Sequence, residues 1–301
     1  MGLFNSNYSR PGPGVSKGAP KDNRFIHYWK IYGRHFWDLM KLNLLFAVPA
    51  IVVLVAGVII SSATRNILLA GLPFIALSPF VAGLTYETRN YIREEHVFVL
   101  HDFLKKLKEN WKQFLANGII CYLVYEVLMI AIPFYAQNQQ KLGSVISTIA
   151  LGLSFATLFI FTSMQFYVPL EIVTFDMKLS KMYRNAGIFA IAALGWNFLG
   201  FFVTAFVLLL LYGCLYLGQY APLFLFIILL LAIFLLWSFW AYTVNSLVYP
   251  TLDRMMIQPT LKKEAEERGE VPEEDLDPAF TDWDSIREDT DDEDDDDEEE
   301  D

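Results

Sequence analysis

The sequence contains few of the residues from which metal sites are built. Only four histidines occur in 301 residues, at positions 27, 35, 96 and 101. The nearest two, His96 and His101, are five positions apart, which turns them toward different faces of a helix. A metal oxygenase or hydroxylase needs several ligands that converge on one site. We therefore expect no metal site and no cofactor.

Motifs for nucleophilic catalysis and phosphate binding are also missing. There is no Gly-x-Ser-x-Gly turn, and neither of the two cysteines has a histidine near it in the sequence. There is no glycine-rich phosphate loop that ends in Gly-Lys-Ser/Thr. Cys121 and Cys214 lie in apolar runs and are expected to be small core residues. The sequence therefore predicts a protein that is not an enzyme.

Long apolar runs are abundant, and they indicate an all-α, polytopic membrane protein. The chain is 54% hydrophobic, and a spanning helix needs about 20 mostly apolar residues. Six such runs are predicted as transmembrane helices, at about 42–61, 67–86, 114–135, 143–169, 187–216 and 222–248. Together they define a membrane domain over residues 25–250, preceded by a flexible arm at 1–24.

The basic residues predict the orientation of these spans, because Lys and Arg beside a span remain cytoplasmic. Of the 23 Lys and Arg residues, 21 lie in the two terminal segments and in the alternate loops 87–113 and 170–186. The other loops contain only Arg65 and Lys141. We therefore expect a multi-pass protein of the cell membrane with both termini in the cytoplasm.

Charge divides the chain into a basic body and an acidic tail. Residues 1–249 carry 18 basic and 10 acidic residues, a sum of +8, whereas residues 250–301 carry 5 basic and 24 acidic residues, a sum of −19. Twelve of the residues 289–301 are acidic, so the cytoplasmic tail 251–301 is expected to be disordered at least from 289. Three roles remain open for this tail: it is simply solvated, it docks on a basic cytoplasmic surface, or it binds divalent cations weakly.

Basic amphipathic segments precede three of the spans. In residues 96–114 an apolar stripe and a group of lysines form a candidate face for a partner or for lipid, suited to the membrane interface. The face consists of Leu100, Phe103, Leu107, Trp111, Lys105, Lys106, Lys108 and Lys112. Residues 25–40 and 175–189 have a similar pattern. The sequence thus allows three repeated units of an amphipathic helix plus a helical hairpin, although multi-span proteins in general have basic and aromatic residues at this level.

Several short motifs, in this linear order, resemble one known family. They are MGLFNSNYSRPGPGVSK at the start, Phe36-Trp37 followed by Lys41-Leu42-Asn43-Leu44-Leu45, Ser78-Pro79-Phe80 with Ala82-Gly83-Leu84, Asp102-Phe103 with Lys108 and Asn110, and VPLEIVTFDMKLSKMYRNA at 168–186. Residues 1–250 resemble the YesL-like family of uncharacterised bacterial integral membrane proteins. Its members often lie near genes for carbohydrate uptake, which implies an association with transport and no particular reaction.

Polar residues inside the apolar runs form a candidate intramembrane site, which consists of Glu126, Asn197, Gln165, Asn43 and Asn245. Amides at such positions commonly join helices by hydrogen bonds. A charged side chain at the bilayer centre costs at least about 2.5 kcal/mol. Glu126 is therefore neutral and hydrogen-bonded to Asn197 or a tyrosine, ionised beside a water-filled cavity, or nearer the membrane surface than its run suggests.

Two functions remain open at this point. The first is a non-enzymatic accessory or assembly factor linked to carbohydrate uptake, with the lipid bilayer, anionic head groups and carbohydrate transporter subunits as partners and no nucleic acid. The second is a small-solute or ion carrier that uses Glu126 as a midplane carboxylate.

Overall fold

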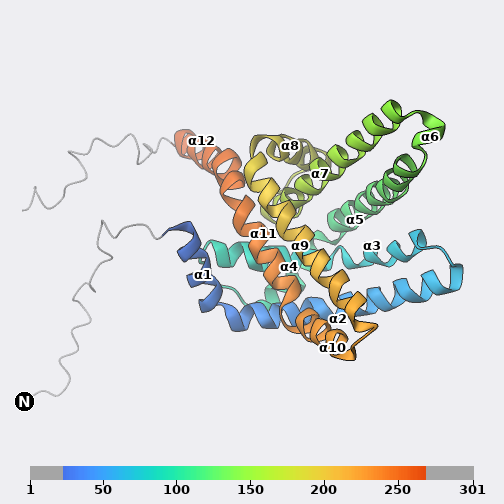
Figure 1. Ribbon diagram of the computed structural model, residues 1–301. Coiled ribbons are helices and arrows are strands. Elements are labelled where there is room, and N and C mark those ends of the chain that lie inside the picture. Colours follow the sequence, from blue (N-terminus) through green and yellow to red (C-terminus); the bar gives the residue numbers. More distant parts are fainter. Residues whose placement is uncertain (1–22, 269–301) are drawn as a thin grey trace, which may run out of the picture.

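The computed structural model describes residues 23–268, with side chains up to Lys263, and within this range it contains helices and no strands (Figure 1). Four helices are long and apolar enough to cross a membrane. They are α2 (Phe36–Thr64), α5 (Val99–Gln137), α7 (Ser144–Thr174) and α9 (Leu194–Gly218). Two bent helix pairs raise the number to six if each pair is one span. The prediction of an all-α membrane protein is confirmed.

The first part of the chain forms a short helix and a hairpin with a broken second arm. It comprises α1 (Arg24–Arg34), α2, the 3₁₀ turn η1 (Leu68–Gly71), α3 (Pro73–Leu77) and α4 (Phe80–Ile92). The arm Leu68–Ile92 is bent by 56°. The bend follows Ser78-Pro79, where the sequence indicates a broken helix, because proline cannot donate the backbone hydrogen bond that would continue α3.

The second part is a hairpin of two long helices. The amphipathic segment 96–114 and the apolar run 114–135 lie in one continuous helix, α5, which has 39 residues. A short turn, α6 (Gln139–Leu142), leads to α7. Helix α7 continues through Pro169 to Thr174, so its last turn lies in the segment 170–186 that the sequence places outside the spans.

The third part again starts with a short helix and ends in a bent arm. It comprises α8 (Leu179–Ala192), α9, α10 (Pro222–Phe234), α11 (Leu236–Leu252), the π-helical turn η2 (Asp253–Ile257) and α12 (Gln258–Arg268). The range 187–216 contains the break between α8 and α9 at Ala193. The range 222–248 is divided at Leu235, where the two arms meet at 57°. The predicted arm 1–24 lies outside the described residues except for its last two positions, and so does the acidic tail from residue 269.

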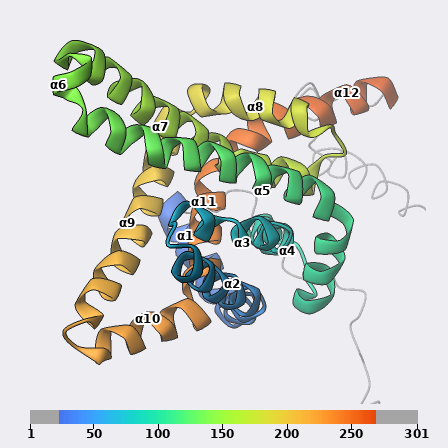
Figure 2. The same cartoon turned by 90° about the vertical axis from the view of Figure 1, so that its right-hand side faces the viewer.

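The three hairpins diverge from a common centre. In both views the α6 turn and the turn between α9 and α10 point away from each other (Figures 1 and 2). Helix α4 lies at the centre and contacts α2, α5, α7 and α11. Two apolar clusters pack against α4. One contains Leu84 of α4 with Leu42, Phe103 and Tyr242 of neighbouring helices, and the other contains Ala82 of α4 with Phe114, Leu170 and Met182. In contrast, only 6% of the apolar window of α9 is buried, so most of that helix is available to lipid.

Candidate functional site

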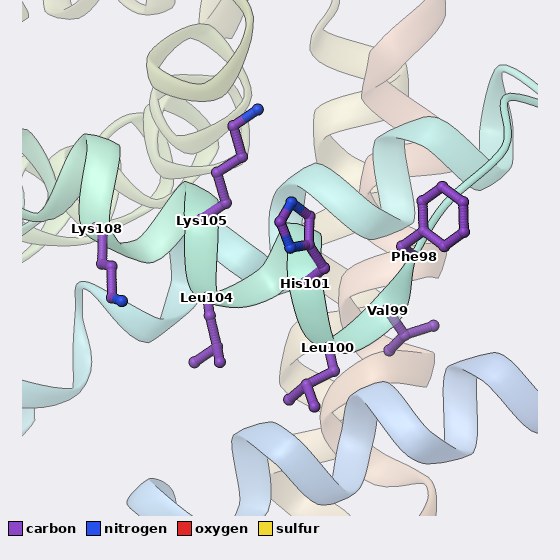
Figure 3. A pocket seen from close by; sticks show the side chains of 7 residues that line it. All are labelled: Phe98, Val99, Leu100, His101, Leu104, Lys105 and Lys108. Carbon is purple, nitrogen blue, oxygen red and sulfur yellow. The ribbon is translucent and has the colours of Figure 1, made fainter.

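The first half of α5 presents an exposed apolar stripe beside exposed lysines. Leu100 is 58% exposed, Leu104 is 43% exposed and Trp111 is 45% exposed. Lys105, Lys108 and Lys112 are also exposed, and at 100° per residue they lie within one arc next to the stripe. An open concavity of about 780 Å³ lies along this face; Figure 3 shows the side chains that line it, which are Phe98, Val99, Leu100, His101, Leu104, Lys105 and Lys108.

The face predicted from the sequence is divided between this surface and the protein core. Leu100, Trp111, Lys105, Lys108 and Lys112 lie outside, whereas Phe103 is buried and Leu107 packs against the same apolar cluster as Phe103. The ammonium group of Lys106 lies 2.7 Å from Glu109 Oε2 and 4.9 Å from the centre of the Tyr86 ring. The stripe is displaced from the predicted positions because α4 covers the side of α5 that carries Phe103.

Two close contacts fix α5 against the broken second arm. A Cβ atom on Gly83 would lie 2.3 Å from the ring of Phe103, and one on Gly118 would lie 2.4 Å from Ser78 Oγ. Both distances are shorter than a van der Waals contact, so these positions require glycine. The hydroxyl of Ser78 donates to the carbonyl of Ile75 over 2.7 Å. This bond gives one backbone carbonyl near the bend a hydrogen-bond partner.

Glu126 lies on the second half of α5, against the start of the broken arm. A Cβ atom on Gly71 would lie 2.8 Å from Glu126 Oε1 and 2.9 Å from the Tyr122 ring. Glu126 Oε2 is buried without a hydrogen-bond partner, while Tyr122 donates to the carbonyl of Leu68 over 3.3 Å. The structure therefore gives Glu126 close neighbours, but within residues 23–268 neither Asn197 nor a tyrosine forms a hydrogen bond with it.

Asn43 supports the bend between α10 and α11. Its Nδ2 atom donates to the carbonyls of Ala232 and Ile233 over 2.9 and 2.7 Å. Its Oδ1 atom accepts from the backbone N–H groups of Trp237 and Ser238 over 2.8 and 2.9 Å. A break in an apolar helix frees backbone groups that must find partners. The side chain of Asn43, on α2, is the hydrogen-bond partner of four such backbone groups.

The other three predicted amides join helices at separate places. Asn197 accepts from the Tyr167 hydroxyl over 2.8 Å and donates to the last carbonyls of α8. Asn245 donates to Thr88 Oγ1 over 2.7 Å, which connects α11 to α4. Gln165 forms a closed ring of hydrogen bonds with Asn117 and Tyr183 across α5, α7 and α8. The structure does not bring these amides together with Glu126 into one site.

Sequence reasoning missed three charged residues that lie in the protein interior. Glu87 on α4 exposes none of its surface, and neither carboxylate oxygen has a hydrogen-bond partner. Glu171 on α7 is equally buried; Asn185 donates to its Oε2 over 3.3 Å and its Oε1 has no partner. Arg89 donates to the carbonyl of Val173 and the hydroxyl of Thr174 at the end of α7.

The missed residues stand just beyond the predicted spans. Glu87 and Arg89 follow the run 67–86, and Glu171 follows Pro169. The helices continue past these limits to Ile92 and Thr174. The signal available in the sequence was the absence of proline and glycine between Leu84 and Ile92.

Near the surface, an ion pair connects the first helix to the loop after α4. Arg34 donates to the carboxylate of Glu94, and this hydrogen bond lowers the pKa of Glu94 from its ordinary value of 4.5. Burial lowers the pKa of His35, at the junction of α1 and α2, from its ordinary value of 6.5, and the nearby positive charge of Arg34 lowers it further.

The geometry defines a class of protein: a helical membrane protein with a polar, tightly packed centre and an exposed basic and apolar face on α5. Within residues 23–268, no three His, Cys, Asp or Glu residues are placed to hold a metal ion. Residues 60–132 match the model of a family described as a protein of unknown function, DUF624. No curated protein and no solved structure matches the chain. The matched segment contains the broken arm and most of α5.

Proposed function

We propose that the protein is a non-enzymatic accessory or assembly factor of the cell membrane and that the exposed face of α5 is its binding surface. The observation that carries this proposal is the exposure of Leu100, Leu104 and Trp111 beside three lysines. A helix with an apolar stripe and a basic flank binds at a membrane interface. Each basic residue near an anionic leaflet contributes about 1 kcal/mol.

The placement of this face supports the proposal further. It belongs to the same unbroken helix as the apolar second half of α5, so no loop separates the binding surface from the predicted span. Its other side is fixed by Phe103 against Gly83, and the exposed residues are therefore held in position before a partner arrives. Preorganisation of this kind reduces the entropy lost on binding.

The orientation and the partner are parts of the same proposal. The distribution of Lys and Arg supports a cytoplasmic position for the exposed face of α5 and for both termini. The resemblance to the YesL-like family suggests the permease or solute-binding subunits of a carbohydrate transporter as partners. Anionic head groups would bind the lysines, and the partner chain would cover the apolar stripe.

The experiment that tests this function is crosslinking in the native membrane, followed by gentle purification and identification of the co-purified chains. Wild type is compared with a variant that carries Leu100→Gln, Leu104→Gln and Trp111→Gln. Leu261→Gln, at an exposed leucine on α12, is the control. We expect transporter subunits with wild type and the control, and their loss with the triple variant. Retention of the same subunits by the triple variant would overturn the proposed face.

A second function is favoured by one observation, namely the buried, unpartnered oxygen of Glu126 beside the broken arm. Broken helices and intramembrane carboxylates are common in carriers of small solutes and ions. The test is uptake by vesicles that contain only this protein. A carrier of this type requires that Glu126→Gln removes the pH dependence of uptake. An absence of uptake by the wild type, or uptake unaffected by the substitution, would eliminate it.

A further inference from the structure

Three basic residues form a row along the start of helix α8, from its N-cap residue Lys178 onward, and have no acidic partner in the part of the chain that the structure describes. Lys178, Lys181 and Arg184 are all exposed, and none of them forms an ion pair with another described residue. Their spacing of three places them along about one third of the circumference of the helix. In contrast, Arg34, Arg93 and Lys106 each form an ion pair with a carboxylate.

The C-terminal segment leaves the fold next to this row. Asn185 of α8 lies 3.8 Å from the sulfur of Met256 in η2, and α8 and α12 lie near each other in both views (Figures 1 and 2). From Met256 to Arg268 the chain advances by about 18 Å along a helix. The chain beyond Arg268 therefore starts about 18 Å along the helix from the contact between Met256 and α8.

The chain beyond Arg268 has the charge and the length to reach back. Residues 269–301 contain 20 acidic residues and one basic residue. The dense acidic run begins at Asp289, 21 residues after Arg268. A chain of 21 residues can span up to about 69 Å, which is more than the roughly 18 Å from Met256 to Arg268 along the helix.

From this complementarity we infer that the acidic run 289–301 docks on the basic row of α8. The contact is electrostatic and reversible, since exposed charges are screened by salt. It gives a particular role to an acidic segment that the sequence alone leaves as solvated, docked or cation-binding.

The test is energy transfer within single molecules. The protein is placed, one copy per disc, in nanodiscs of neutral phosphatidylcholine, with dyes at Ser180→Cys on α8 and Asp301→Cys and with Cys121 and Cys214 replaced by Ser. Neutral lipid makes the result independent of lipid binding by α5. We expect efficient transfer in about 0.1 M salt, where the Debye length is about 10 Å, and a loss of roughly half or more in about 1 M salt, where it is about 3 Å.

Matched charge reversals locate the contact. Lys178→Glu, Lys181→Glu and Arg184→Glu together should reduce the transfer as strongly as high salt does. The α5 reversal used as the control, Lys105→Glu and Lys108→Glu with Lys141→Glu on α6, makes the same change in net charge and should leave the transfer unaltered. Transfer that ignores the α8 reversal, falls with the α5 reversal or is insensitive to salt would overturn the inference. Each of these results leaves the proposed function of α5 to its own experiment.

Discussion

The centre of the molecule and the outer surfaces of its hairpins differ in their packing and polarity. Around α4 the helices approach so closely that Gly83 and Gly118 have no room for a Cβ atom. At Gly152 on α7 and Gly213 on α9, a Cβ atom would meet nothing within 4 Å. The centre also contains buried polar side chains, including Glu87, Arg89 and Asn90 on α4 alone, whereas the exposed surface of α9 and α10 is almost entirely apolar.

This difference follows from the surroundings of each region, which are lipid tails at the hairpins and other protein groups at the centre. Lipid tails are as apolar as leucine, so the hairpin ends gain little by packing against one another. The centre contains two helix breaks and several helix ends, whose free backbone groups lipid cannot satisfy. Protein groups must supply these hydrogen bonds, and helices are held together where they do so.

The largest effect is expected from Asn43→Ala. The substitution removes the partners of two carbonyls and two N–H groups at the bend before α11. Each buried group left without a partner costs about 1–3 kcal/mol, so the free energy of unfolding should fall by about 3 kcal/mol or more. The control is Asn138→Ala at a hairpin end, where one donor bond to Phe134 is lost. Equal thermal shifts of the two variants in the same detergent would contradict the comparison.

A smaller difference is expected between two Gly→Ala substitutions. Gly83→Ala would place a methyl group 2.3 Å from the Phe103 ring, and overpacking of this type costs about 1–3 kcal/mol. Gly152→Ala meets no atom within 4 Å and should raise helix stability by up to about 1 kcal/mol. Thermal unfolding of both variants measures the difference. A stabilising Gly83→Ala would show that α4 and α5 are less closely packed than described.

Glu87→Met is expected to stabilise the protein by about 1 kcal/mol, because it replaces a buried carboxyl whose oxygens have no partner with an apolar side chain of similar volume. Glu126→Met should have a smaller effect, since Glu126 is half-buried and only one of its oxygens is buried without a partner. Unfolding midpoints of the two variants give the measurement. A loss of stability with Glu87→Met would reveal an interaction that Glu87 makes.

The smallest effect concerns Glu94, outside the apolar helices. Its pKa is lowered in the folded protein by the hydrogen bond from Arg34, so its contribution to stability is present above the ordinary value of 4.5 and is lost as the pH falls through the lowered pKa. Both side chains are substantially exposed, which keeps the contribution small. Carboxyl NMR should show the pKa of Glu94 rising toward 4.5 in Arg34→Ala. An unchanged pKa would remove the role of this pair.

The sequence predicts the apolar helices better than the places where they break. Apolar runs predict the helices, and Pro79 marks the first bend, because both signals are local. The bend at Leu235 follows no proline or glycine, and it depends on Asn43, which is more than 190 positions away in the chain. Pro169, in contrast to Pro79, does not end a helix, since α7 continues past it to Thr174. The buried polar residues are harder to predict than the helices. Glu87 is buried because α2, α5, α7 and α11 all pack against α4, and the spacing of residues within α4 does not reveal these neighbours.

Helix α5 spans both regions without a joint. Its 39 residues correspond to about 58 Å, roughly twice the thickness of the hydrocarbon layer. Its first half is held by the contacts of Phe103 with Gly83 and of Gly118 with Ser78, and its second half carries Glu126. Because the two halves form one continuous helix, a tilt of the half that carries Leu100 and Trp111 would also displace Glu126.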